Sequence, residues 1–214
     1  MDSYLETFNT WNKIAVAYEE KFMDLNIYNK TFDTFCGALK KTNASVFEIG
    51  CGPGNISRYL LSKRPDFNLF GIDIAPKMVE LAAANNPTAK FQTIDARNIG
   101  ELKQNFDGII CGFCLPYLSI KDCETLIANC YHLLNENGII YLSFVEGNPK
   151  HSNYMSGSTG DRVYFYYHSL AEIKRQLQQN NFQTLETFHL NYEKANGETE
   201  IHSVLLAQKK KLKA

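Results

Sequence analysis

Residues 46–55, VFEIGCGPGN, followed by Asp73 in LFGIDI, decide the fold of this chain. The apolar residues before the first glycine predict a short buried strand, and the residues after Asn55 repeat apolar side chains at helical spacing. Gly50, Gly52 and Gly54 therefore lie in a strand-to-helix turn. Glycine there permits positive φ and lets a ligand approach the main chain, while free N–H groups at the helix start favour an anion. The stretch predicts a site for a ligand with a carboxylate or a phosphate.

The spacing of the glycines indicates which ligand is expected. Dinucleotide-binding turns have the pattern GxGxxG, which needs a third glycine at position 55, but this chain has Asn55 there. The observed pattern is GxGxG, preceded by Glu48. Asp73 ends the next strand, and a carboxylate at that place can accept both hydroxyl protons of a ribose. A nucleoside other than NAD is therefore expected.

At these residues the chain resembles the class I S-adenosylmethionine-dependent methyltransferases. Their first motif is an acidic residue followed by GxGxG, and their second is an acidic strand end. The resemblance covers about residues 45–208 and implies S-adenosylmethionine as the cofactor, with its methionine part over the glycine turn and its ribose on Asp73. Any strand-to-helix turn can carry glycines, but the joint occurrence of Glu48, the three glycines and Asp73 favours the ligand site.

The cofactor-binding residues that we predict lie at the strand ends and among the N-terminal aromatic residues. The resemblance implies that Ile74 packs on adenine and that Asp95 bonds the adenine amino group. Asp95 alternatively caps the turn at 96–102, and the two roles are compatible. Met78 either touches the nucleoside or packs in the core. The full predicted set is Tyr18, Glu48, Gly50, Gly52, Gly54, Asn55, Asp73, Ile74, Met78, Asp95, Ala96 and Cys111.

The hydrophobic pattern along the chain predicts alternating strands and helices. Two helices are expected within residues 4–40. The expected strands are 45–50, 68–73, 89–94, 106–112, 138–145, 182–193 and 199–208, and the expected helices between them are 54–63, 76–84, 120–134 and 169–179. The last two strands join around Asn196 and Gly197, a hairpin signal.

This alternation predicts an α/β fold with a Rossmann-like, doubly wound, seven-stranded sheet. The sheet is mostly parallel, with an antiparallel C-terminal hairpin strand that matches the methyltransferase resemblance. We expect one domain over residues 1–214, consisting of an N-terminal helical cap over 1–44 and a cofactor-binding core over 45–208. Residues 146–168 are expected to form a loop that contacts the substrate.

The balance of charge narrows the classes of partner. The chain has 22 Lys and Arg against 23 Asp and Glu, a formal net charge of −1, so general attraction to nucleic acid or anionic membrane is not expected. The N-terminal residues are too polar for a signal peptide, and no apolar run reaches the roughly 20 residues of a spanning helix. These features predict a cytoplasmic protein that acts on a small molecule, without membrane association. Oligomeric state cannot be inferred.

The six cysteines lie mostly in apolar runs and are expected to be reduced thiols. Cys111 and Cys114 form one CxxC without a second pair, so no metal is predicted. Lysines 209, 210, 211 and 213 are expected to form a solvated chain end.

The methyl acceptor is expected beside residues 114–117, CLPY. Amino-methylating nucleic-acid enzymes of the resembling fold carry Asn or Asp before Pro, Pro and an aromatic residue here, so Cys114 is evidence against adenine as acceptor. We predict substrate contacts from aromatic residues and one guanidinium, which could hold a carboxylate. The predicted contacts are Trp11, Phe22, Arg162 and Tyr166.

No catalytic residue is assigned, because methyl transfer from a sulfonium needs alignment and exclusion of water more than an acid. Candidates for a base or a contact to the reacting atom are His151, Tyr154 and Tyr117. His151 is alternatively a surface residue, residues 164–168 an edge strand, and the aromatic residues of the first helix core packing.

The sequence therefore predicts a methyltransferase that transfers a methyl group to an oxygen or nitrogen atom of a small molecule by in-line displacement. The alternatives are a protein or nucleic-acid acceptor, a nicotinamide oxidoreductase, and a noncatalytic methyl-donor-binding protein.

Overall fold

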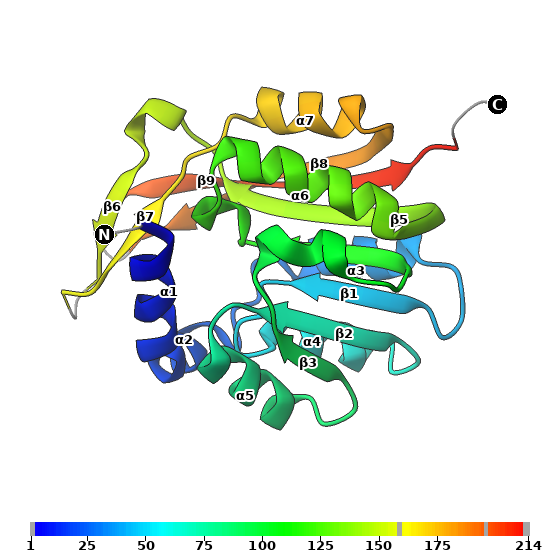
Figure 1. Ribbon diagram of the computed structural model, residues 1–214, viewed down its shortest axis with the longest axis horizontal. Coiled ribbons are helices and arrows are strands. Elements are labelled where there is room, and N and C mark those ends of the chain that lie inside the picture. The colour runs from blue at the N-terminus through cyan, green and yellow to red at the C-terminus, as the bar shows by residue number, and fades with distance from the viewer. Residues whose placement is uncertain (1–2, 158–159, 195–196, 212–214) are drawn as a thin grey trace.

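The computed structural model describes residues 3–157, 160–194 and 197–211, and its centre is a seven-stranded sheet (Figure 1). The strands of this sheet are β1 (Ser45–Ile49), β2 (Asn68–Asp73), β3 (Lys90–Thr93), β4 (Phe106–Gly112), β5 (Leu134–Val145), β8 (Phe182–Glu193) and β9 (Thr199–Lys209). Their order is β3-β2-β1-β4-β5-β9-β8. The first five pair in parallel, and β9 runs antiparallel to β5 and β8. The predicted seven-stranded fold with its antiparallel hairpin is confirmed.

Helices cover both faces of the sheet, so consecutive strand residues are buried on opposite sides. On one face α6 (Ile120–Leu133) and α7 (Leu170–Gln179) pack in a core with Phe47 and Ile109. On the other face α4 (Asn55–Lys63) packs in a second core with Val46 and Ile110. α5 (Pro76–Asn85) follows β2 and contacts β2, β3 and α4. This double burial explains why the strands β1 and β4 are almost continuously apolar.

The boundary between α6 and β5 differs from the sequence prediction. We expected the helix to reach residue 134 and the strand to begin at 138, but β5 begins at Leu134, which pairs with Phe106. The register then shifts before Gly108. Asn137 has a φ of 61° inside β5, so the Asn-Gly pair expected to end the helix lies within an irregular strand.

The N-terminal region contains three helices among the described residues, where we predicted two. They are α1 (Ser3–Lys13), α2 (Ala15–Phe22) and α3 (Asn29–Ala38). The break at Ile14 escapes the hydrophobic pattern because apolar residues recur at helical spacing on both sides of it. Phe32 and Phe35 of α3 join the second core, whereas α1 and α2 contact α5 beside the carboxyl ends of the strands (Figure 1). α1 and α2 therefore cover that end of the sheet.

The segment expected as a substrate loop, 146–168, contains a short hairpin. β6 (Asn153–Ser156) pairs antiparallel with β7 (Arg162–Phe165), and the turn η3 (Pro149–His151) precedes them. The hairpin binds α1: the Thr10 hydroxyl donates to the carbonyl of Arg162 (2.8 Å), and the Tyr164 N–H donates to the Thr7 hydroxyl (2.9 Å). α1 and this hairpin thus form one unit, seen together in Figure 1.

Two expected features fall on residues outside the description, namely Asn196 in the hairpin turn and Lys213 in the basic tail. All six cysteines are described and are free thiols. No helix within the described ranges is long and apolar enough to cross a membrane.

Candidate active site at the carboxyl ends of the strands

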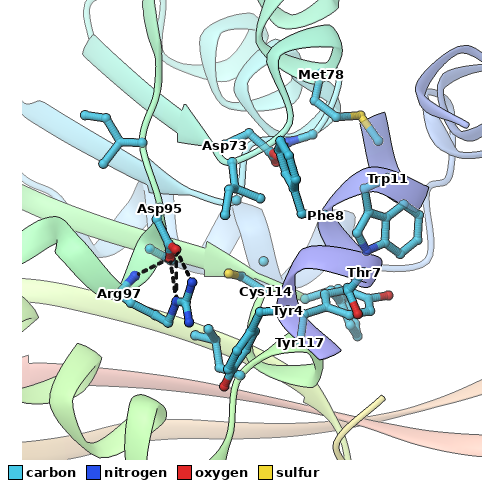
Figure 2. A pocket seen from close by; sticks show the side chains of 18 of the residues that line it. Tyr4, Thr7, Phe8, Trp11, Asp73, Met78, Asp95, Arg97, Cys114 and Tyr117 are labelled. Carbon is cyan, nitrogen blue, oxygen red and sulfur yellow. Dashed lines mark hydrogen bonds and ion pairs between the residues drawn. The ribbon is translucent and has the colours of Figure 1, made fainter. Parts of the chain in front are cut away.

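A cavity opens beyond the carboxyl ends of β1, β2 and β4, under α1 (Figure 2). We call it the glycine-turn pocket. In open α/β sheets ligands bind at this edge. Of the predicted cofactor residues, those that line the pocket are Tyr18, Gly50, Gly52, Asp73, Ile74, Met78, Asp95 and Ala96. Further lining comes from residues that we did not assign to the cofactor: Tyr4, Thr7, Phe8, Trp11, Ile94, Arg97, Gly112, Phe113, Cys114, Tyr117 and Leu118.

The glycines of the turn have different neighbours. Gly52 has a φ of +52°, and a Cβ there would meet nothing nearer than the Tyr18 ring at 3.7 Å. Its main chain is thus open to a ligand. Gly54 has a φ of +83°, but a Cβ there would lie 2.4 Å from Nδ2 of Asn86 and 3.1 Å from Cα of Ala82. Gly54 therefore allows α4 and α5 to approach each other and does not line the pocket.

The Asp73 carboxylate is fixed by the main chain at the end of β2. Oδ2 accepts from the N–H of Gly52 (2.9 Å), and Oδ1 accepts from the N–H of Ala75 (2.9 Å). Burial raises the pKa of Asp73, and these N–H groups oppose that shift. Each oxygen can accept a further hydrogen bond, because a carboxylate oxygen has more than one acceptor position. The carboxylate both holds the glycine turn and faces the pocket.

Asp95 caps the 3₁₀ turn η1 (Ala96–Glu101), the capping role that the sequence left open. Its Oδ1 accepts from the N–H of Arg97 (2.9 Å), and its Oδ2 accepts from Nη2 of Arg97 (2.5 Å), as the dashed lines of Figure 2 show. The guanidinium lies over the Tyr4 ring, 4.1 Å from its centroid. Arg97 gives this pocket a cation that the sequence prediction missed. The adenine contact of Asp95 stays a prediction.

Two predicted cofactor residues, Glu48 and Cys111, are fully buried and do not line the pocket. Glu48 accepts from the Ser57 hydroxyl through Oε2, while Oε1 has no hydrogen-bond partner in the described part of the chain. Burial raises the pKa of Glu48 to about 8, so it is mainly a neutral carboxylic acid at pH 7. Cys114, three residues after Cys111, lines the pocket in its place.

A second cavity adjoins the first, and we call it the aromatic chamber. The two share the wall residues Trp11, Tyr18, Gly50, Gly52, Gly112, Phe113 and Tyr117. The other aromatic residues of the chamber are Phe22, Tyr28, Phe32, Phe165, Tyr192 and His202. Asn55, predicted as a cofactor residue, lines this chamber and not the first pocket.

Trp11 stands at the shared wall. Its ring lies edge-on to Tyr18 (5.4 Å between centroids) and to Tyr117 (5.1 Å). Its indole nitrogen is buried and has no hydrogen-bond acceptor among the residues that the structure describes. A buried N–H without a partner is costly, so a ligand acceptor atom would satisfy it. Burial also raises the pKa of Tyr18 to about 12, so this phenol keeps its proton.

Several residues predicted at the acceptor lie outside both cavities. Arg162 pairs with Glu6 of α1 and covers the ring of Tyr154, 4.3 Å from its centroid. Tyr166 stacks on Tyr4 at 6.4 Å, and His151 is exposed on η3. The sequence prediction failed here because the hairpin turns these side chains toward α1 and solvent. Trp11, Phe22 and Tyr117 do line the chamber.

Four polar residues that line the chamber were missed by the sequence prediction. They are Tyr28, Tyr192, Glu200 and His202. A signal existed in β9, where His202, Val204 and Leu206 alternate on one buried face, so His202 is a polar residue in an apolar row. Its neighbours come from distant segments, which no local pattern reveals.

The chain matches a family model described as "Methyltransferase domain" over residues 46–138. It is 35% identical over 105 residues to the malonyl-[acyl-carrier protein] O-methyltransferase of Acetivibrio thermocellus. The aligned residues cover 48% of this chain and 36% of that protein. It is 30% identical over 107 residues to a carboxy-S-adenosyl-L-methionine synthase of Campylobacter jejuni, covering 48% and 44%. The aligned part spans less than half the length of these curated relatives.

Among solved structures, the fold is similar to magnesium protoporphyrin IX methyltransferase from Synechocystis PCC 6803, solved with bound SAH. The TM-score is 0.74 at 18% identity, covering 97% of this chain and all of that one. At this identity the similarity establishes the fold alone.

Proposed function

We propose that this chain is a class I S-adenosylmethionine-dependent methyltransferase that transfers a methyl group to an oxygen or nitrogen atom of a small molecule. The observation that carries the proposal is the pair of adjoining cavities. The glycine-turn pocket would hold the methyl donor, and the aromatic chamber would hold the acceptor, with Trp11, Tyr18 and Tyr117 at their shared wall. Because the same residues line both cavities, a donor in one and an acceptor in the other would lie side by side, away from bulk water.

The residues of the glycine-turn pocket fit S-adenosylmethionine. Asp73 would accept from the ribose hydroxyls, and Ile74 would pack on adenine. The space beside Gly52 lets the donor approach the main chain, and the unpaired indole N–H of Trp11 is suited to a polar group of the donor. When bound, the cofactor supplies an electrophilic methyl carbon on a positively charged sulfur. The role of the protein is then to align the acceptor and exclude water.

The lining of the chamber favours a neutral or cationic acceptor with apolar surface. Among the described residues that line it, none is Lys or Arg, and Glu200 is the one carboxylate. Arg162, which we expected to hold a carboxylate, is bound to Glu6 instead. Aromatic rings bind flat apolar groups and cations, and Glu200 would repel an anion.

We extend the proposal to the organisation of residues 1–214 as one domain. Within it α1, α2 and the β6–β7 hairpin would close the site, and Phe165 of that hairpin would touch the acceptor. A nicotinamide oxidoreductase is disfavoured, because Asn55 replaces the third glycine of the dinucleotide pattern.

A protein or nucleic-acid acceptor and a noncatalytic donor-binding protein are the alternatives. The net charge of −1 is unfavourable for nucleic acid. The relatives differ in the reactions that their names describe, so their substrates are not carried over to this chain.

Calorimetry with S-adenosylmethionine and its demethylated product tests the donor half. We expect binding of both, with a dissociation constant in roughly the micromolar range. Transfer from labelled donor to a panel of small hydroxyl and amine compounds, a protein extract and tRNA tests the acceptor half. The absence of any heat with both cofactor forms would contradict the proposal. Binding without transfer to any acceptor class would favour the noncatalytic alternative.

A further inference from the structure

Three polar side chains meet on the wall of the aromatic chamber that the terminal hairpin builds. Glu200 and His202 are two residues apart in β9, so both side chains lie on the same face of the strand. Tyr28 precedes α3 and reaches the same wall from the N-terminal region. All three line the chamber where we propose that the acceptor binds.

The contacts place these groups in a row. The Tyr28 hydroxyl lies 2.6 Å from Nδ1 of His202, a hydrogen bond. On the other side of the imidazole, Nε2 lies 3.8 Å from Oε2 of Glu200. Tyr192, the cross-strand partner of Glu200, stacks on the imidazole with ring centroids 4.7 Å apart and planes 13° from parallel. The ring orientation is therefore fixed on two edges and one face.

The charges around His202 favour the neutral ring with its proton on Nε2. Its side chain is buried, which lowers the pKa, and the nearby Glu200 carboxylate partly opposes that shift. Glu200 also accepts from Nζ of Lys194 (3.0 Å) and from the Tyr167 hydroxyl (3.3 Å). An anion beside Nε2 attracts the proton to that nitrogen, which leaves Nδ1 free to accept from Tyr28.

We infer that Tyr28, His202 and Glu200 form a proton relay that takes the proton from the methyl acceptor. The inference rests on the proposed function. The acceptor hydroxyl or amine gives its proton to the oxygen of Tyr28 as Tyr28 gives its own proton to Nδ1 of His202. The electron pair left on the acceptor atom forms the new bond to the methyl carbon. The carbon–sulfur bond breaks, and its electron pair stays on sulfur, which becomes neutral.

Each member has a distinct role in this relay. Tyr28 is the catalytic residue, because its hydroxyl touches the acceptor. His202 receives the proton and becomes an imidazolium, and Glu200 is a positioning residue that stabilises this cation through Nε2–H. Phenols and alcohols need such a base because each must lose its proton for the methylated product to be neutral, and a protonated amine needs one because loss of a proton frees the electron pair that attacks the methyl carbon.

The first test reads the state of His202 directly and needs no acceptor. In the full-length protein with ¹⁵N-labelled histidine, His202→Gln identifies the His202 signals. We expect a neutral ring at pH 7, protonated on Nε2 and accepting at Nδ1. Tyr28→Phe should change the Nδ1 shift, whereas His189→Gln should not, because His189 bonds Ser203 (3.2 Å) instead. A ring charged at pH 7, or one with its proton on Nδ1, would overturn the relay.

The second test uses methyl transfer from labelled S-adenosylmethionine to neutral phenols, benzylic alcohols and aromatic amines. Tyr28→Phe keeps the ring and removes only the hydroxyl. The parent should lose activity in acid, because a protonated His202 cannot take the proton. In Tyr28→Phe we expect kcat to fall about 100-fold and this loss in acid to disappear, while donor affinity by calorimetry stays within about 2-fold. Glu200→Gln should lower kcat about 10-fold and shift the pH range over which methyl transfer is lost in acid. His189→Gln serves as the matched control.

The outcomes separate the relay from the proposed function. If the donor binds and methyl transfer occurs, but Tyr28→Phe retains kcat and its pH profile, the relay is wrong and the methyltransferase proposal stands. If the donor does not bind, the proposed function fails on calorimetry. If the donor binds but no acceptor in the panel is methylated, the histidine spectra decide the relay.

Discussion

The glycine-turn pocket and the aromatic chamber share a wall but are built by different means. The strand side of the pocket is formed by main-chain groups and carboxylates at the strand ends, with Asp73 bound to two backbone N–H groups, while α1 adds the rings of Tyr4, Phe8 and Trp11. The chamber is shaped by rings from α1, α2, α3, β8, β9 and the β6–β7 hairpin. The glycine-turn pocket is therefore suited to one invariant ligand. The aromatic chamber can bind different ligands when its side chains change, while the fold stays the same.

The largest effect should come from damage to the pocket alone. Asp73→Ala removes the acceptor for the ribose hydroxyls and the hydrogen bond that holds the N–H of Gly52 in the glycine turn. Because hydrogen bonds to a charged group contribute about 1.5–3 kcal/mol each, we expect donor affinity to fall at least about 30-fold in calorimetry. The control is Asp33→Ala, since Asp33 lies outside both cavities. Unchanged donor affinity in Asp73→Ala would show that the ribose assignment is wrong.

A pair of glycine variants separates ligand space from packing. Gly54→Ala places a Cβ against Asn86 and Ala82, so we expect a loss of about 1–3 kcal/mol in the free energy of unfolding. Gly52→Ala places its Cβ in the pocket, and donor affinity should suffer more than stability. Denaturant melts and calorimetry of both variants measure the contrast. The division of roles fails if Gly54→Ala is as stable as the parent protein.

The pH dependence of stability tests the buried carboxyl beneath the turn. Because the folded pKa of Glu48 is about 8 and its ordinary value is 4.5, the folded state holds the proton more tightly. The contribution of Glu48 to stability is full below about pH 4.5 and is lost as pH rises toward about 8. Glu48→Gln should therefore gain stability relative to the parent as pH rises from 5 to 8. Parallel stability curves would contradict this account.

The smallest effect is expected at Arg162, on the outer side of the chamber's cover. Its ion pair with Glu6 is exposed, and such pairs contribute about 0–1 kcal/mol. Arg162→Ala should leave donor affinity and the KM for any acceptor within about 2-fold. A large rise in KM for acceptors that carry a carboxylate would restore the role that the sequence suggested.

The fold and the pocket were largely predictable because their signals are local. The strands β1, β2 and β4 are apolar runs, and strand ends lie at the pocket: Gly52 follows β1, Asp73 ends β2 and Asp95 follows β3. The N-terminal helix count and the β6–β7 hairpin were mistaken, because helical spacing continues across Ile14 and short strands carry little pattern.

The chamber could not be predicted to the same degree. Tyr28 and His202 are 174 residues apart in the chain, and their contact depends on the hairpin lying beside β5. Arg162 attracted attention as the one cation in an aromatic segment, but its position depends on the pairing of β7 with α1. Residue type alone does not show which way such a side chain points.

The central claim is that the methyl donor and the acceptor meet at the wall shared by the two cavities. Nuclear Overhauser effects from the ¹³C-labelled methyl group of bound S-adenosylmethionine measure this directly, without an acceptor. We predict effects to ring protons of Trp11, Tyr18 or Tyr117, each assigned by its loss in a Leu or Phe variant. A bound methyl group that shows effects only to residues outside this shared wall would contradict the account.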